Sequence, residues 1–292
     1  MKILVQDLNH SVAISEEFAN TASGKVKSGG LLFNRRVTRI VTPGTLIDEK
    51  FINPFENNFL LAISPANPGV PQLSQEEPTE LGATHTFHSS VQKRDIGLAW
   101  LDLSTGDFYT QATANSLLPS AIARIGAREI VIDSATSEAT EQALLGASDQ
   151  NSQVITRHRV EHPELPISQW TLMLEGSVSP NEIEAFTRQE MVAGNILLEY
   201  VKERLQGSGM KLQPPIRKQD NESMTIDKNS LRGLEILETA KDGIPGGKGS
   251  LLHTVRRTVT KGGTRMLKEW IGKRSLPASF SFCSSTMVVI QS

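Results

Sequence analysis

The stretch that decides the fold runs from Gly249 to Ile271 and reads GSLLHTVRRTVTKGGTRMLKEWI. Apolar residues recur at helical spacing in two parts of it, which predicts helices over 250–255 and 263–273. Threonine and glycine separate the two parts, as is typical of a short interhelical loop. Two groups of basic residues lie within the same stretch, so it combines predicted helices with positive charge.

The 70 residues before this stretch also predict helices. Ser179-Pro180-Asn181-Glu182 has the residues that favour a helix start, and apolar residues follow at helical spacing to Leu205, which predicts one helix of about 25 residues. Asp227 is a candidate N-cap for a second helix that carries Leu231, Leu234, Ile236 and Leu237 and ends before Gly243. The second half of the chain is therefore expected to be mainly α-helical.

The first half alternates short apolar runs with helical patterns. Strands are expected at 57–63, 96–103, 108–110, 128–133 and 153–156, and helices at 116–125 and 137–145, with Ser137 as the N-cap of the latter. The turn Ser104-Thr105-Gly106-Asp107 joins the second and third strands into a hairpin. Four prolines in residues 64–92 predict a flexible loop. The order β-β-β-α-β-α-β predicts an α/β domain.

Four segments, taken in chain order, resemble the MutS family of DNA mismatch-repair proteins. They are the strand and turn at 36–49, the hairpin at 98–108, the run DKNSLRGLEI at 227–236, and the opening stretch at 249–271. The resemblance implies a ribonuclease-H-like α/β connector domain followed by a mainly α-helical, incomplete core (lever) domain. It implies the tail of a mismatch-binding domain at 1–44, the connector at 45–160, a partial core at 161–275, and a divergent tail at 276–292.

The run Leu31–Arg36 and the long loop at 64–92 look most like the fungal mitochondrial branch of this family. The resemblance therefore implies a mitochondrial location, with nuclear or cytoplasmic locations as alternatives. The N-terminus reads neither as a signal peptide nor as a transit peptide, and no segment reads as a transmembrane helix. The charge-free tail at 276–292 departs from the family pattern, which leads us to expect an altered or truncated gene ending.

Members of the family bind mismatched double-stranded DNA as a dimer and use ATP and Mg²⁺ to signal to downstream repair factors. The resemblance thus implies DNA, a second MutS-type subunit and repair factors as partners. The family's mismatch wedge, Phe-x-Glu, does not occur in this sequence. The loop from Asp242 to Ser250 imitates a P-loop, but Gly249 separates Lys248 from Ser250 and Asp242 replaces the first glycine. We therefore expect no enzyme activity and no cofactor in this chain, and a mobile loop at this position.

A stand-alone nucleic-acid enzyme of ribonuclease-H-like type is the alternative, and a non-functional truncated product is a third. Two-metal cleavage needs clustered carboxylates. Asp133 alone stands at a suitable strand end, while Asp102 lies within a strand and Asp107 in a turn. His158 and His162 fall in an expected linker without acidic or cysteine partners at metal-site spacing. The pattern predicts neither a nuclease site nor a metal site.

Composition and charge limit the remaining possibilities. The 292 residues are enough for about two domains, and the single cysteine excludes an internal disulfide. The net charge of −2 conceals a basic segment, since residues 200–274 hold 16 Lys and Arg against 8 Asp and Glu. Such charge predicts contact with the nucleic-acid backbone, or else a solvated face or charge that pairs with an acidic domain absent from this sequence. The candidate phosphate contacts are Arg256, Arg257, Lys261, Arg265, Lys268 and Lys273, followed by Arg274, whereas Trp270 is expected to pack in the core.

Overall fold

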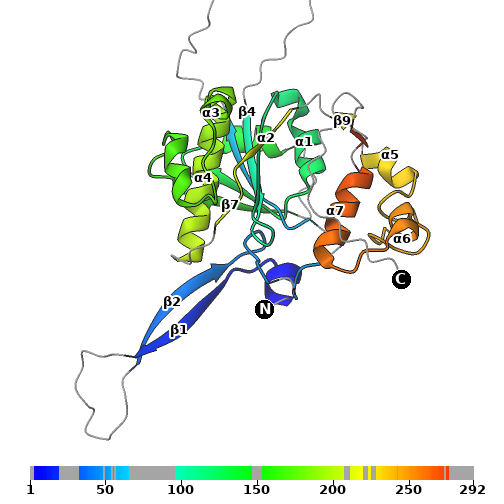
Figure 1. Ribbon diagram of the computed structural model, residues 1–292, viewed down its shortest axis with the longest axis horizontal. Coiled ribbons are helices and arrows are strands. Elements are labelled where there is room, and N and C mark those ends of the chain that lie inside the picture. The colour runs from blue at the N-terminus through cyan, green and yellow to red at the C-terminus, as the bar shows by residue number, and fades with distance from the viewer. Residues whose placement is uncertain are drawn as a thin grey trace, which may run out of the picture. The chain divides into compact units, whose positions relative to one another are not determined.

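A computed structural model of the chain shows its fold (Figure 1). The residues that it describes are 3–19, 33–48, 50–53, 55, 57–65, 96–146, 153–206, 211–219, 223–224, 228–241, 243–272 and 274–275. They form two compact units, Met1–Gln219 and Asp220–Ser292. The predicted flexible loop, beyond Pro65, and the predicted divergent tail lie outside the described residues. No helix among those described is both long and apolar enough to cross a membrane.

A six-stranded mixed sheet forms the centre of the Met1–Gln219 unit, with strand order β7-β6-β3-β4-β5-β8. Neighbours β3, β4 and β5 pair antiparallel, while β6 pairs with β3, β7 with β6, and β8 with β5 in parallel. The bounds are β3 Leu60–Pro65, β4 Ile96–Asp102, β5 Asp107–Thr113, β6 Glu129–Asp133, β7 Val154–His158 and β8 Ile216–Lys218. The predicted order of strands and helices is confirmed through β7, and β8 is an addition that the sequence pattern did not predict.

Helices cover the two faces of this sheet (Figure 1). Helix α1, Leu118–Ile125, buries Leu118, Ile122 and Ile125 against one face, together with Leu144 of α2, Glu138–Leu145. A short 3₁₀ turn at Asn115–Leu117 precedes α1, and the side chain of Ser137 caps α2 as predicted. Helix α4, Arg188–Leu205, packs on the opposite face. The two faces thus have separate apolar cores.

The helix predicted to run unbroken to Leu205 is two helices, α3 Pro180–Ala185 and α4. Phe186 is extended between them, and Thr187 accepts the Glu190 amide hydrogen while Glu190 accepts that of Thr187. This reciprocal cap starts a new helix and explains the break. The motif Thr187-x-x-Glu190 was present in the sequence, but the apolar spacing across it concealed the boundary.

The segment before α4 is tied to that helix rather than forming a linker between domains. Asn195 of α4 donates to the carbonyl oxygens of Pro163 and Leu165, at 2.8 and 2.9 Å, and accepts from the Trp170 indole at 2.6 Å. Trp170 belongs to the 3₁₀ helix Ile167–Leu172. The predicted domain boundary after residue 160 therefore falls inside a compact unit that continues to Gln219.

Residues before the sheet form a β-hairpin, β1 Val12–Ala19 with β2 Phe33–Val41, that extends from the rest of its unit (Figure 1). A π-helical turn, Ile3–Asp7, precedes it. Val5, Val41, Leu46 and Ile52 form a small apolar cluster at its base. The hairpin is therefore anchored through its base to the segment that leads into β3.

The Asp220–Ser292 unit contains the short helices α5 Lys228–Gly233 and α6 Leu251–Val255, the longer α7 Lys261–Gly272, and the strand pair β9 Ser223–Met224 and β10 Arg274–Ser275. The helices predicted at 250–255 and 263–273 are confirmed within two residues. The helix predicted from Asp227 to Gly243 is wrong in length, because it ends at Gly233 and Glu235 adopts a φ of 50°. A left-handed residue at that point ends the helical path, so Leu234, Ile236 and Leu237 lie beyond it.

Candidate functional site

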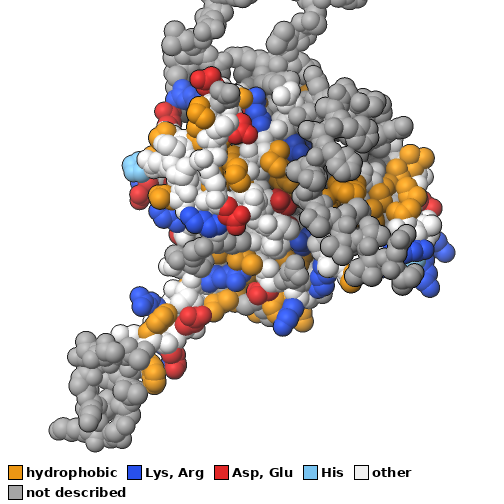
Figure 2. Space-filling model, in the orientation of Figure 1, with side chains coloured by type: hydrophobic (Ala, Val, Ile, Leu, Met, Phe, Trp, Pro, Cys, Tyr) orange, Lys and Arg blue, Asp and Glu red, His pale blue; other side chains and the backbone are white. Residues whose placement is uncertain are grey.

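The predicted phosphate contacts lie around α6 and α7. Arg256 and Arg257 follow α6 directly, and Lys261 begins α7. Arg257 is exposed and donates to the carbonyl oxygens of Thr254 and Arg256, whereas Arg256 and Lys261 are half-buried. Figure 2 shows blue Lys and Arg side chains close to orange apolar ones over this unit. The loop between the two helices thus presents positive charge at its surface.

The other candidates differ in access. Arg265 is 9% exposed and Lys268 is half-buried, both on α7. Lys273 lies outside the described residues, and Arg274 is in β10. The Arg265 guanidinium is buried, which favours a role in stabilising the unit over a role in binding phosphate. The accessible members of the predicted set are therefore Arg256, Arg257, Lys261 and Lys268.

Trp270 does not pack in the core as predicted. Its side chain is 54% exposed, and Met266, one helical turn earlier, is 48% exposed. Leu267 and Ile271 on the adjoining face are half-buried. The helical spacing predicted an apolar face correctly, but it could not show that part of this face lacks a covering element among the described residues.

The P-loop-like segment before α6 is held by its own backbone. Gly243, Gly246 and Gly249 have positive φ values, and the Gly246 amide donates to the Leu237 carbonyl at 2.8 Å. The Ser250 hydroxyl, which a P-loop would direct to Mg²⁺, caps α6 by accepting from the His253 amide at 3.2 Å. These contacts explain the glycines and the serine without a nucleotide.

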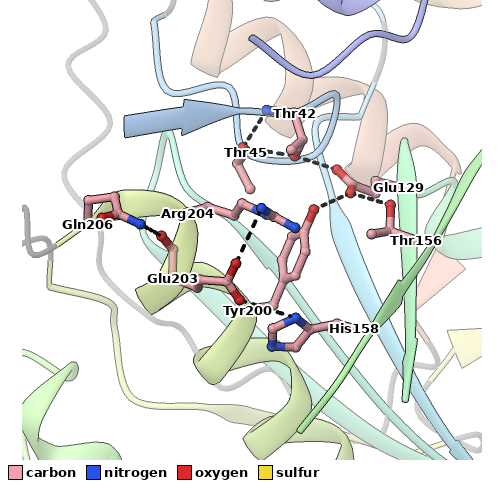
Figure 3. Close-up of polar contacts among 9 residues, drawn as sticks. All are labelled: Thr42, Thr45, Glu129, Thr156, His158, Tyr200, Glu203, Arg204 and Gln206. Atoms are coloured by element: carbon pink, nitrogen blue, oxygen red, sulfur yellow. Dashed lines mark hydrogen bonds and ion pairs between the residues drawn. The ribbon is translucent and has the colours of Figure 1, made fainter. Parts of the chain in front are cut away.

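A buried carboxylate forms the most connected polar site in the Met1–Gln219 unit (Figure 3). Glu129, at the start of β6, is 1% exposed. Its Oε2 atom accepts from the Thr42 hydroxyl at 2.5 Å and the Gly44 amide at 2.9 Å. Its Oε1 atom accepts from the Tyr200 hydroxyl at 2.6 Å and the Thr156 hydroxyl at 2.7 Å. Four neutral donors thus compensate the burial of one charge. The one signal of this site in the sequence is the acid that opens the apolar run at 129–133, and it was not among the predicted site residues.

The turn at Thr42–Thr45 is shaped to reach this carboxylate. The Thr45 hydroxyl accepts from the Thr42 amide at 2.8 Å and lies 2.9 Å from the Thr42 hydroxyl, which orients the latter toward Glu129. A Cβ atom on Gly44 would lie 2.9 Å from Glu129 Cβ and 2.7 Å from Leu60 Cδ1. The turn therefore requires glycine because of close approach rather than because of backbone angle.

Tyr200 of α4 connects the carboxylate to a second polar group. His158 stacks edge-on against the Tyr200 ring, and its Nδ1 atom lies 3.4 Å from Glu203 Oε2. The Arg204 guanidinium lies over the same ring, 4.7 Å from the centroid. The prediction that His158 lies in a linker is wrong, because this residue ends β7 and is buried. Burial, and then the neighbouring Glu129 carboxylate, raise the pKa of the Tyr200 hydroxyl.

This pKa shift predicts a loss of stability at high pH. Unfolded tyrosine ionises near pH 10, while folded Tyr200 stays protonated to higher pH, so the unfolded state binds fewer protons above pH 10. The free energy of unfolding should therefore fall by up to about 1.4 kcal/mol per pH unit above pH 10 because of this group. Urea unfolding at pH 8 to 11 should show a shallower decline in Tyr200→Phe. Equal slopes in the two proteins would contradict the assignment.

The carboxylates considered for a nuclease do not assemble. The Asp102 Oδ1 atom accepts from the Ser104 amide and hydroxyl at 2.8 and 2.6 Å, and Asp107 accepts from the Thr105 hydroxyl at 2.6 Å. Asp133 accepts from the Ala135 amide at 3.0 Å. Among the residues that the structure describes, no group of three or more His, Cys, Asp or Glu side chains could hold a metal ion. These carboxylates shape turns.

A buried ion pair fixes α4 against the sheet edge. Glu190, fully buried, accepts from Arg217 Nε of β8 at 3.0 and 3.2 Å through its two carboxylate oxygens. The same carboxylate caps α4 by accepting from the Thr187 amide at 2.8 Å. Its negative charge also lies at the positive end of the helix dipole. Sequence reasoning missed this pair, because β8 was not predicted.

Two family models match the chain. The model described as MutS domain II covers residues 81–213, and the model described as MutS domain III covers residues 229–275. Together they account for more than half of the chain. The first match includes β4 to β7 and the whole of α4, and the second includes α6, α7 and the basic residues described above.

Curated relatives give the same result. DNA mismatch repair protein MutS of Anaplasma phagocytophilum is 30% identical over 263 residues, which are 90% of this chain and 28% of that protein. The proteins of the same name from Wolbachia pipientis and Ruegeria pomeroyi are 28% and 27% identical, covering 91% and 90% of this chain and 28% and 27% of their own lengths. The chain thus spans little more than a quarter of these relatives. The chain belongs to the MutS family and matches its domains II and III.

Proposed function

We propose that this chain acts in DNA mismatch repair as a connector and the beginning of a lever, without reading mismatches or hydrolysing ATP itself. The proposal rests mainly on the family models for MutS domains II and III, which match the chain in that order. The similar curated relatives are named DNA mismatch repair protein MutS. The proposed role concerns the residues of this sequence, in which neither the Phe-x-Glu wedge nor a P-loop sequence occurs. The role left to the chain is to join partners and to contact the DNA backbone.

Finer features of this proposal rest on the family resemblance. A ribonuclease-H-like connector is supported by the mixed sheet, in which antiparallel β3, β4 and β5 are followed by helix-connected parallel β6 and β7. A second MutS-type subunit and downstream repair factors are the proposed protein partners. A mitochondrial location and a fungal mitochondrial relationship are supported by the Leu31–Arg36 run. Subcellular fractionation that found the protein outside mitochondria would refute that location.

The DNA role predicts weak binding that depends on salt rather than on mismatches. The four accessible basic residues can neutralise about four phosphates, and these contacts should give log K a slope of about −3.6 against log salt. Matched and mismatched duplexes should bind equally, because backbone contacts carry no sequence information. Fluorescence anisotropy across a salt series measures both quantities.

Single substitutions sharpen this experiment. Lys268→Ala should reduce the slope by about one, since it removes one phosphate contact. Lys202→Ala, an exposed residue of α4, serves as the matched loss of one positive charge and should leave the slope unchanged. A clear preference for mismatched duplex, or equal effects of the two substitutions, would refute the proposed interface.

A further inference from the structure

The Glu129 carboxylate joins three segments that are far apart in the sequence. Its two oxygens accept from different segments. Oε2 accepts from Thr42 and Gly44, while Oε1 accepts from Tyr200 and Thr156 (Figure 3). The first pair belongs to the turn that directly follows hairpin strand β2. The second pair belongs to α4 and to β7. One side chain therefore contacts the base of the hairpin and the main helix at once.

The framework around the carboxylate is rigid. Glu129 pairs with Leu60 of β3 and Val154 of β7, so its backbone is held by a neighbouring strand on each side. Tyr200 is fully buried, and the His158 ring of β7 lies edge-on against its ring. Thr42 and Thr45 are also buried. Because these groups are buried, water cannot readily replace the hydrogen bonds that the turn donates. A displacement of the turn must therefore change the hydrogen bonds of the carboxylate.

We propose that Glu129 is a coupling point through which displacement of the β1–β2 hairpin changes the packing of α4. When the turn moves away, Oε2 loses both donors in a site that excludes water, and an unsatisfied buried carboxylate is strongly disfavoured. The carboxylate then turns toward the remaining donors or takes up water, and in either case its bond with Tyr200 changes. The two arrangements, turn docked and turn released, are the two states that such coupling requires. This inference is independent of the proposed role in mismatch repair.

The coupling predicts an effect across the carboxylate, which amide hydrogen exchange can measure in the full chain. Tyr200→Phe removes a donor to Oε1 only, yet it should accelerate exchange of the Gly44 amide, which donates to Oε2, by about fivefold or more. The exchange rate is compared with that of the Ala99 amide in β4, which reports general loosening of the sheet. In the reverse direction, Thr42→Val should accelerate exchange of the α4 amides around Tyr200, while Thr42→Ser should leave them unchanged.

A matched control separates coupling from simple destabilisation. Val201→Ala alters a buried α4 side chain beside Tyr200 that is not bonded to Glu129. It should accelerate Gly44 and Ala99 exchange by the same factor. The proposal is overturned if Tyr200→Phe leaves Gly44 exchange unchanged relative to Ala99, or if Val201→Ala produces the same selective acceleration. If Tyr200→Phe does not fold, the Thr42→Val and Thr42→Ser pair decides alone.

Discussion

Arg217→Ala should lower the free energy of unfolding of the Met1–Gln219 unit by about 3 to 5 kcal/mol. The substitution removes the only described cation within ion-pair distance of the fully buried Glu190 carboxylate. A buried charge without its partner retains the cost of desolvation and loses the compensating attraction. The substitution should also destabilise the start of α4, because the same carboxylate caps that helix.

Urea unfolding of the full chain measures this effect through the fluorescence of Trp100 and Trp170, in a Trp270→Phe background. Arg188→Ala is the matched control, because Arg188 also lies at the start of α4 but pairs with the exposed Glu164. An exposed pair of this kind contributes about 0 to 1 kcal/mol. Adding Glu190→Gln to Arg217→Ala should recover part of the stability, since the amide carries no charge. Equal losses in Arg217→Ala and Arg188→Ala would contradict a role for burial.

Local sequence patterns correctly predicted the strands and helix starts whose signals lie within a short run of residues. Residues 128–133 and 96–103 predicted strands because continuous apolar runs bounded by turns have few alternatives, and Ser137 predicted a helix start through its capping chemistry. These signals lie within a few residues of one another. They required no knowledge of what the rest of the chain does, and for that reason they were reliable.

The parts that could not be predicted depend on partners distant in sequence. Strand β8 has three residues and forms only by pairing with β5, about 100 residues earlier. The environment of Glu129 could not be predicted, because its four donors come from segments 27 to 87 residues away. His158 appeared to be a linker residue because its burial depends on Tyr200. Long-range packing of this kind leaves no local periodicity.

The approach of α4 to the sheet is a further long-range feature that Gly97 permits, and Gly194 permits the approach of Trp170 to the same helix. A Cβ atom on Gly97 of β4 would lie 2.1 Å from the carbonyl carbon and oxygen of Gln189 and 2.5 Å from the Glu190 amide nitrogen. A Cβ atom on Gly194 of α4 would lie 2.3 Å from Trp170 Cη2. At Gly97 the obstacle is backbone, which cannot rotate away, so the first turn of α4 must move from the sheet.

Gly97→Ala is therefore expected to destabilise the Met1–Gln219 unit by about 3 kcal/mol, at the upper end of the usual range for overpacking. Displacing the first turn of α4 also lengthens the Glu190–Arg217 contact, so the combined Gly97→Ala and Arg217→Ala variant should lose less than the two single losses added together. Gly176→Ala is the control, because a Cβ atom there meets its nearest neighbour, Pro214 Cγ, at an ordinary 3.6 Å. It should change stability by less than about 1 kcal/mol. Urea unfolding in the same Trp270→Phe background compares the variants. A tolerated Gly97→Ala, or strict additivity with Arg217→Ala, would show that α4 does not rest on the backbone of β4 as described.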